Sequence, residues 1–275
     1  MSCSAYAKGT GAMSTRVIAI DWSGAKRNAA KKIWLAEFRD RQPFGLPRNG
    51  KDSTEVLDYL VRSCVDHCET VVGIDFAFSF PDWFIADQGC RTAEEMWNRV
   101  ESAGERWLKE CGDPFWGRPG KKNPRRPETE QFRKTDRDFL VKDIHPKSIF
   151  QIGGAGAVGT GSIRGMRLLR QLSREGFSIW PFQPDGWPRV IEIWPRALTG
   201  VVRKTNLIAR EAYIDAHCHE LPTEWKHCAA SSEDAFDAIV SAVAMNRYVG
   251  ELESLRQETD ARYLKEGRIW GAARA

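Results

Sequence analysis

The stretch Val17-Ile18-Ala19-Ile20-Asp21 is short, continuous and rich in β-branched residues, a pattern that predicts a buried strand ending in a carboxylate. Two later stretches repeat this pattern, Val71-Val72-Gly73-Ile74-Asp75 and Val190-Ile191-Glu192. Burying an ionised carboxylate at such a strand end costs several kcal/mol unless a partner compensates its charge. The three acids therefore predict either a shared site or three separately paired side chains.

A late helix supplies further acids. Asp234 and Asp237 lie in the stretch Ser232 to Val240, where they are three residues apart and so share one helical face. A single Arg or Lys cannot pair with every acid at once, whereas Mg²⁺ or Mn²⁺ is held by several carboxylates in this way. We therefore expect a hard-cation site, and metal-assisted phosphodiester hydrolysis is the reaction class that follows. The alternative is that each acid is capped or paired near its own strand end.

The composition is that of a globular protein. The chain has 275 residues with 11 Trp, which is enough for a large core. No apolar run approaches about 20 residues, so we expect no membrane span. The seven Cys are an odd number that favours reduced thiols, and the first residues do not resemble a secretory signal. These features predict a cytoplasmic protein.

Strand patterns alternate with helical patterns, which predicts an α/β protein with a mixed sheet. Apolar and polar residues alternate over 32–39, which predicts a second strand antiparallel to the first. Further strands are expected at 70–76, 177–182 and 189–194, and helices at about 53–68, 92–111, 162–175, 206–219, 232–249 and 251–265. We expect a flexible tail over 1–15 and a single domain over 16–265, with an insertion at about 82–150.

The segment 118–147 is basic, rich in Pro and preceded by aromatic residues. Its cationic residues are Arg118, Lys121, Lys122, Arg125, Arg126, Arg133, Lys134, Arg137, Lys142 and Lys147. Arg and Lys among prolines and aromatics suit a loop that contacts a phosphate backbone, and the formal net charge of +4 permits nucleic-acid binding. The alternative is a solvated surface insertion.

A glycine run over 153–161 matches G-x-G-x-x-G at Gly154, Gly156 and Gly159. The motif lies mid-chain, whereas a dinucleotide-binding fold carries it in its first strand-to-helix turn. The N–H groups of this loop and the start of the next helix, which carries Arg164, suit a phosphate instead. The alternative is a packing loop where backbones approach closely.

These motifs together resemble the RNase H-like arrangement. The late helix is similar to the closing helix of RuvC-type resolvases, and the whole set resembles domain-of-unknown-function family 429, whose members are predicted RNase H-like nucleases. The motifs that carry the resemblance are 18–24, 73–81, 151–159, 191–195 and 234–238. The resemblance covers about residues 16–249 and implies an RNase H-like mixed sheet with an antiparallel first hairpin, flanking helices and a basic Pro-rich insertion.

For a two-metal nuclease of this kind, Asp21 bridges both ions, and Asp75 and Asp237 each complete one ion. Asp234 or Glu192 is then the further ligand, although Glu192 points to the other face if strand alternation places it there. Mg²⁺ or Mn²⁺ is the expected cofactor, and nucleic acid is the expected partner. The expected contacts to phosphate or substrate are Ser23, Lys26, Gly154, Gly156, Arg164 and Arg196.

Two other functions fit the same pattern. A phosphotransferase or nucleotide hydrolase of the actin and hexokinase type shares the core and places an Asp at the end of its first strand. Such proteins usually need two copies of the fold, and this chain has room for one copy with insertions. The third interpretation is a non-catalytic nucleic-acid-binding protein. Loss of the acidic residues would favour it, and these residues are present here.

Overall fold

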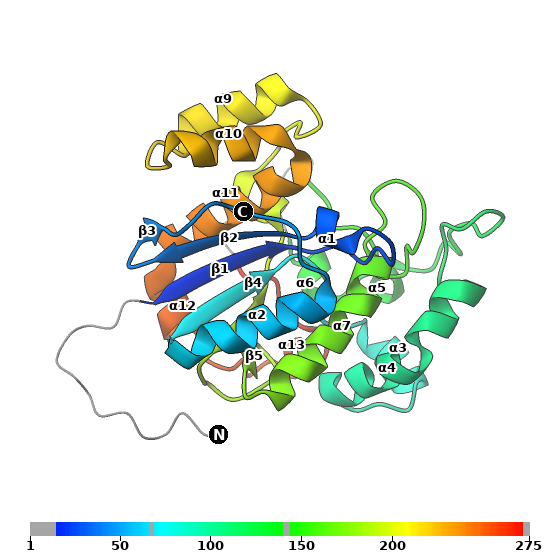
Figure 1. Cartoon of the computed structure of the whole chain (residues 1–275). Coiled ribbons are helices and arrows are strands. Elements are labelled where there is room, and N and C mark those ends of the chain that lie inside the picture. Colours follow the sequence, from blue (N-terminus) through cyan, green and yellow to red (C-terminus); the bar gives the residue numbers. More distant parts are fainter. Residues whose placement is uncertain (1–14, 67–68, 140–143, 272–275) are drawn as a thin grey trace.

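The computed structural model describes residues 15–66, 69–139 and 144–271 (Figure 1). Apart from Thr15, the tail expected over 1–15 lies outside these ranges, and so does Lys142. Within the described ranges, no helix is both long and apolar enough to cross a bilayer.

A mixed six-stranded sheet forms the centre, with the strand order β3-β2-β1-β4-β6-β5. The strands are β1 (Arg16–Asp21), β2 (Trp34–Arg39), β3 (Gln42–Pro43), β4 (Thr70–Ile74), β5 (Ser178–Ile179) and β6 (Arg189–Glu192). β1 pairs antiparallel with β2 and parallel with β4, and β4 pairs parallel with β6. The prediction of an α/β fold with a mixed sheet and an antiparallel first hairpin is confirmed.

Each face of the sheet has its own apolar core, because successive side chains of a strand point to opposite faces. Ile18 and Ile20 of β1 belong to one core, and Val17 and Ala19 belong to the other. α2 (Ser53–Asp66) and α7 (Gly159–Arg174) cover the first face, and α4 (Ala93–Glu110) packs against α7 (Figure 1). α11 (Glu233–Arg247) covers the second face, where α9 (Leu207–His217) and α10 (Thr223–Ser231) pack beside it.

α11 lies close against β4 because the strand has a glycine at the contact. A Cβ atom on Gly73 would lie 2.5 Å from Met245 Sδ of α11 and 2.9 Å from Ile193 Cγ2. A larger residue there would push the helix away from the sheet. This close packing holds α11 against the sheet beside the carboxyl end of β4.

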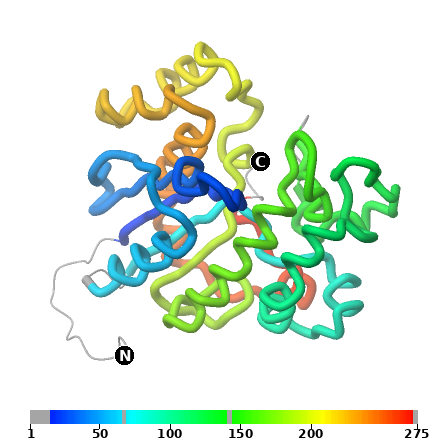
Figure 2. The backbone as a smooth tube through the Cα atoms, turned by 45° about the vertical axis from the view of Figure 1, so that its right-hand side comes forward, coloured from blue at the N-terminus to red at the C-terminus, as the bar shows by residue number. Residues whose placement is uncertain are grey.

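The predicted insertion combines helices with irregular segments. It contains α3 (Asp82–Asp87), α4, α5 (Glu128–Gln131) and α6 (Lys134–Arg137). Thr92 caps the start of α4, since the Glu95 N–H donates to Thr92 Oγ1 over 3.1 Å. Figure 2 shows this green part of the chain well apart from the yellow and orange α9–α10 pair.

Several predicted boundaries differ from the structure. The strand expected at 177–182 is reduced to β5, because Pro181 has no N–H to donate to a ladder. The helix expected at 251–265 is replaced by α12 (Val249–Ser254) and α13 (Tyr263–Glu266), since the polar residues from 256 to 260 offer no apolar face. The pattern also missed α10, and α8 (Pro195–Thr199) is a single short turn of helix.

The turn after β1 packs directly on the start of α7. A Cβ atom on Gly24 would lie 2.6 Å from both Gly161 Cα and Thr160 O, and the Trp22 indole N–H donates to Gly161 O over 3.0 Å. The two backbones approach closely here, as the packing interpretation of the glycine run expected.

We predict that Gly24→Ala lowers the free energy of unfolding by about 1–3 kcal/mol, because its methyl group would meet backbone atoms that cannot move aside. Gly112→Ala is the matched control, since a Cβ atom there meets nothing within 4 Å, and its change stays within about 0.5 kcal/mol. Urea denaturation of both variants measures the difference. Equal stabilities would contradict the close approach.

Candidate metal centre

Three of the predicted carboxylates meet at one end of the sheet. Asp21 ends β1, Asp75 directly follows β4, and Asp237 lies in the second turn of α11. Each offers a carboxylate oxygen, and these oxygens all lie within 4.8 Å of one another. The parallel pairing of Ile20 with Ile74 explains the meeting of the first two acids, and the close packing of α11 explains the third. We call Asp21, Asp75 and Asp237 the carboxylate triad.

Burial and mutual repulsion disfavour the charged forms of the triad. Burial, followed by the charge of Asp237, raises the pKa of Asp21 well above its usual range. The same two causes raise the pKa of Asp75 to about 8, and burial is the main cause of the raised pKa of Asp237. Without added positive charge, the triad therefore holds protons at neutral pH. A carboxylate triad of this geometry can hold a metal ion.

Lys204 belongs to the candidate site, and the sequence did not indicate it. It lies between α8 and α9, and its ammonium group forms an ion pair and hydrogen bond with Asp237. The positive charge of Lys204 also partly offsets the rise in the pKa of Asp21 and of Asp75. Its surroundings in the sequence, from 201 to 206, give no sign that distinguishes it from a surface lysine.

A buried arginine fixes the backbone that carries Lys204. The Arg210 guanidinium donates to the Lys204 carbonyl, and its Nε and Nη2 donate to Ala230 O over 3.0 and 2.6 Å. Ala230 lies near the end of α10, a few residues before α11 begins. The lysine is therefore positioned from the same part of the fold that positions Asp237.

Asp234 lies beside the triad but is not among its mutually close carboxylates. It is half-buried one turn before Asp237, and its negative charge contributes to the raised pKa of both Asp21 and Asp237. The expected shared helical face is therefore present. Asp234 therefore influences the triad through its negative charge and lies next to it without belonging to it.

Glu192 points to the opposite face of the sheet. Its partner in the ladder is Ile74, which belongs to the core under α2, α4 and α7, whereas Asp75 follows on the other face. The buried Glu192 carboxylate accepts two hydrogen bonds from Arg133, over 2.8 and 2.6 Å, and one from the Phe78 N–H over 3.0 Å. Because successive side chains of a strand point to opposite faces, Glu192 lies away from the triad and pairs with Arg133 instead.

Arg133 belongs to the basic insertion, and its side chain is buried in a network of ion pairs. Besides Glu192, its guanidinium bonds Asp136 through Nε over 3.1 Å and Nη2 over 2.8 Å. Removing one partner of such a buried charge network costs about 3–5 kcal/mol. The pair therefore anchors the insertion to the end of β6. Arg118, Lys121, Lys122 and Arg125 remain exposed in the same segment.

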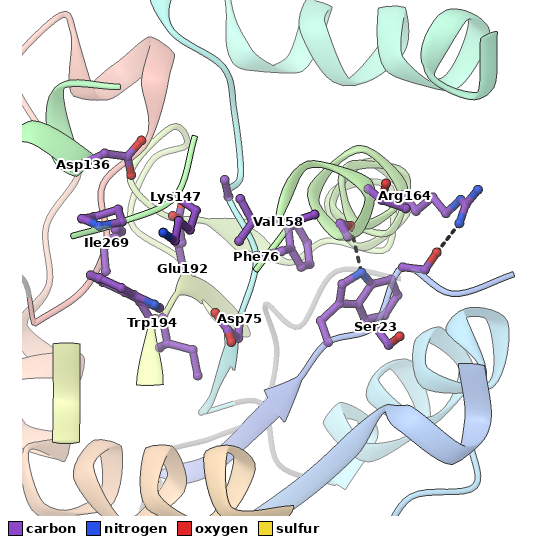
Figure 3. Close-up of a pocket in the computed structure, with 18 of the residues that line it drawn as sticks. Ser23, Asp75, Phe76, Asp136, Lys147, Val158, Arg164, Glu192, Trp194 and Ile269 are labelled. Carbon is purple, nitrogen blue, oxygen red and sulfur yellow. Dashed lines mark hydrogen bonds between the residues drawn. The ribbon is translucent and has the colours of Figure 1, made fainter. Parts of the chain in front are cut away.

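A cavity of about 470 Å³ opens beside the triad (Figure 3). Asp75 forms part of its wall, together with Phe76 and Trp194, and Ser23 and Arg164 lie on the far side in the view of Figure 3. Val158, from the end of the glycine run, also faces the cavity. We call this cavity the strand-end pocket, since the turns after β1, β4 and β6 line it.

The predicted phosphate contacts divide into two groups. Ser23 and Arg164 line the strand-end pocket, and Lys26 lies nearby, joined to Glu105 over 2.8 Å. Arg164 also pairs with Glu105 over 2.8 Å, and that hydrogen bond is the main cause that lowers the pKa of Glu105 to about 2. Gly154, Gly156 and Arg196 are exposed and lie outside the lining of this pocket.

The raised pKa of Asp75 has a consequence for stability. Asp75 ionises near pH 4 when the chain is unfolded but near pH 8 in the metal-free fold, so between these values the folded protein binds the extra proton and loses stability as the pH rises. We predict that Asp75→Asn raises the Tm at pH 8 in EDTA by about 3 °C or more, with a smaller gain at pH 5. Asp87→Asn, at an exposed acid, is the control. A lower Tm for Asp75→Asn at pH 8 would contradict this account.

No protein-family model matches this chain, and no curated protein or solved structure is similar enough to it to count as a match. The resemblance to family 429 therefore rests on the motifs of the chain itself. The candidate centre rests on three carboxylates from two strand ends and one helix, with Lys204 beside them.

Proposed function

We propose that this protein is an RNase H-like nuclease that hydrolyses phosphodiester bonds of nucleic acid with the help of a divalent cation. The observation that carries the proposal is the carboxylate triad, whose oxygens lie within 4.8 Å of one another although its members are far apart in the sequence. Buried carboxylates that repel one another reduce stability, so their meeting needs a reason outside folding. Binding of a hard cation supplies that reason.

The fold supports the proposal. The first strand lies inside the sheet and ends in Asp21, its hairpin partner β2 is antiparallel, and the next strand, β4, leads into Asp75. A late helix brings Asp237 to the same point. This is the arrangement that the RNase H-like resemblance implies for its metal ligands. Within the described residues there is one such sheet, which agrees less well with the two-lobed actin and hexokinase type.

The donor set fits Mg²⁺ or Mn²⁺, which prefer carboxylate oxygens. Asp21, Asp75 and Asp237 would hold the ion. A divalent cation at these oxygens would stabilise the negative charge that phosphodiester hydrolysis develops on the phosphoryl oxygens. Because the pKa of Asp75 is about 8 without metal, loading the site displaces protons and is favoured by rising pH.

The positive charge of Lys204 affects how many divalent cations the triad needs. Three ionised carboxylates carry a charge that one divalent cation and one ammonium group neutralise together. Lys204 contacts Asp237 and is held in place through Arg210, so it supplies that ammonium from within the protein. We therefore propose one divalent cation at the triad, with Lys204 in place of the second cation of a two-metal site.

Nucleic acid is the substrate that best fits the surroundings. Arg164 and Lys147 line the strand-end pocket, and the insertion carries further exposed cations. Cationic side chains of this kind contact phosphates and make binding salt-dependent. The formal net charge of +4 agrees with a polyanionic partner.

The direct test is a cleavage assay on labelled single-stranded and double-stranded DNA and RNA, with Mg²⁺, with Mn²⁺ and with EDTA. We predict cleavage that needs the metal and that falls about 100-fold or more in Asp21→Asn, because that change removes the central ligand. Asp87→Asn, at an exposed acid of α3, keeps the wild-type rate. Absence of metal-dependent cleavage on all four substrates would contradict the proposed function.

A further inference from the structure

We propose that the strand-end pocket binds one unpaired nucleotide of a nucleic-acid strand, so that the protein selects single-stranded or locally opened substrates. This inference rests on the proposed function, since it names the form of substrate that reaches the same centre. It is carried by the walls, the charges and the position of the pocket.

The walls offer flat apolar surfaces that are already fixed in place. Trp194 is half-buried and packs edge-on against Phe139, with ring centroids 4.7 Å apart. Behind another wall, the buried Trp22 indole donates to Gly161 O and lies 5.6 Å from the buried Phe76 ring, which makes that wall rigid. Aromatic rings held in this way bind a base by stacking without losing much conformational freedom.

Positive charge is available in the same cavity for the phosphate of that nucleotide. Lys32 and Lys147 line the pocket and are exposed, so their ammonium groups are free to move towards an anion. Arg164 lies on the side opposite Trp194 (Figure 3), where its guanidinium is paired with Glu105. Arg133 is also in the lining, but its guanidinium is committed to Glu192 and Asp136.

The position of the pocket links binding to the centre. Asp75 is both a wall of the pocket and a member of the carboxylate triad. A nucleotide in this pocket would therefore share a cavity with one carboxylate of the triad. The pocket would place a sugar-phosphate unit at the centre, which a binding site elsewhere on the surface would not do.

The shape of the pocket decides between paired and unpaired substrates. In a duplex each base is stacked and paired, and it reaches a concave site only after leaving the stack, at a cost in free energy. A cavity of about 470 Å³ with aromatic walls accepts a base that is already free. Single strands, loops and frayed ends therefore bind more tightly than an intact duplex of the same length.

The test is a fluorescence-anisotropy titration of the full chain, in EDTA, with labelled short oligothymidylate, oligouridylate and the matching duplex. We expect single strands to bind more tightly than duplex, and Trp194→Leu to weaken single-strand binding about tenfold or more. Trp187→Leu is the matched control, because Trp187 is also half-buried but contacts Arg189 outside the pocket; its effect stays within about twofold. Equal effects of the two changes, or equally tight duplex binding, would overturn the inference.

A second variant tests the pocket independently, in case Trp194→Leu impairs folding. Lys147→Ala changes an exposed side chain of the pocket, and we expect it to reduce the salt dependence of single-strand binding by about one phosphate contact. An unchanged salt dependence would count against the pocket. Binding in EDTA does not need the metal, so loss of cleavage with intact pocket binding would refute the proposed nuclease activity and leave this inference standing.

Discussion

Three carboxylates share one end of the sheet, and the rest of the site follows from the need to balance their charge. Each is disfavoured in its ionised form by burial and by its neighbours, which raises the pKa of all three. Lys204 supplies one positive charge, and a divalent cation is the simplest source of the remainder. Two parallel strands and one closely packed helix each contribute one of these acids. Such elements fix the position of a carboxylate more firmly than a loop would.

Successive side chains of β6 point to opposite faces of the sheet, so this strand contributes to two different environments. Ile191 and Ile193 face α11 and the triad, and Glu192 between them faces the other core. The chain uses this second acid to bind Arg133, which ties the basic insertion to the sheet. One strand therefore supports both the centre and the attachment of the basic insertion. The repelling carboxylates of the triad and the paired carboxylate of Glu192 lie on opposite faces of the sheet.

Much of this arrangement could be predicted from residue patterns. The apolar runs before Asp21 and Asp75 identified strands that end at one edge, and the spacing of Asp234 and Asp237 identified their shared helical face. The position of Glu192 depended on the register of β6, which a four-residue strand does not reveal in sequence. Lys204 could not be predicted, because the contact between its loop and α11 is set by tertiary packing through Arg210. The number of helices between 206 and 249 was also hidden, since α10 has no strong apolar periodicity of its own.

We propose that the triad is a cation site built around Asp21 and completed by Lys204. The decisive measurement is a calorimetric titration of Mn²⁺ into the metal-free protein at pH 8, with Asp21→Asn beside the wild type. We predict one ion bound per wild-type chain, with release of protons, and no comparable binding to Asp21→Asn. Two ions per wild-type chain would contradict the role of Lys204, and binding that is absent from the wild type or unchanged in Asp21→Asn would contradict the metal centre itself.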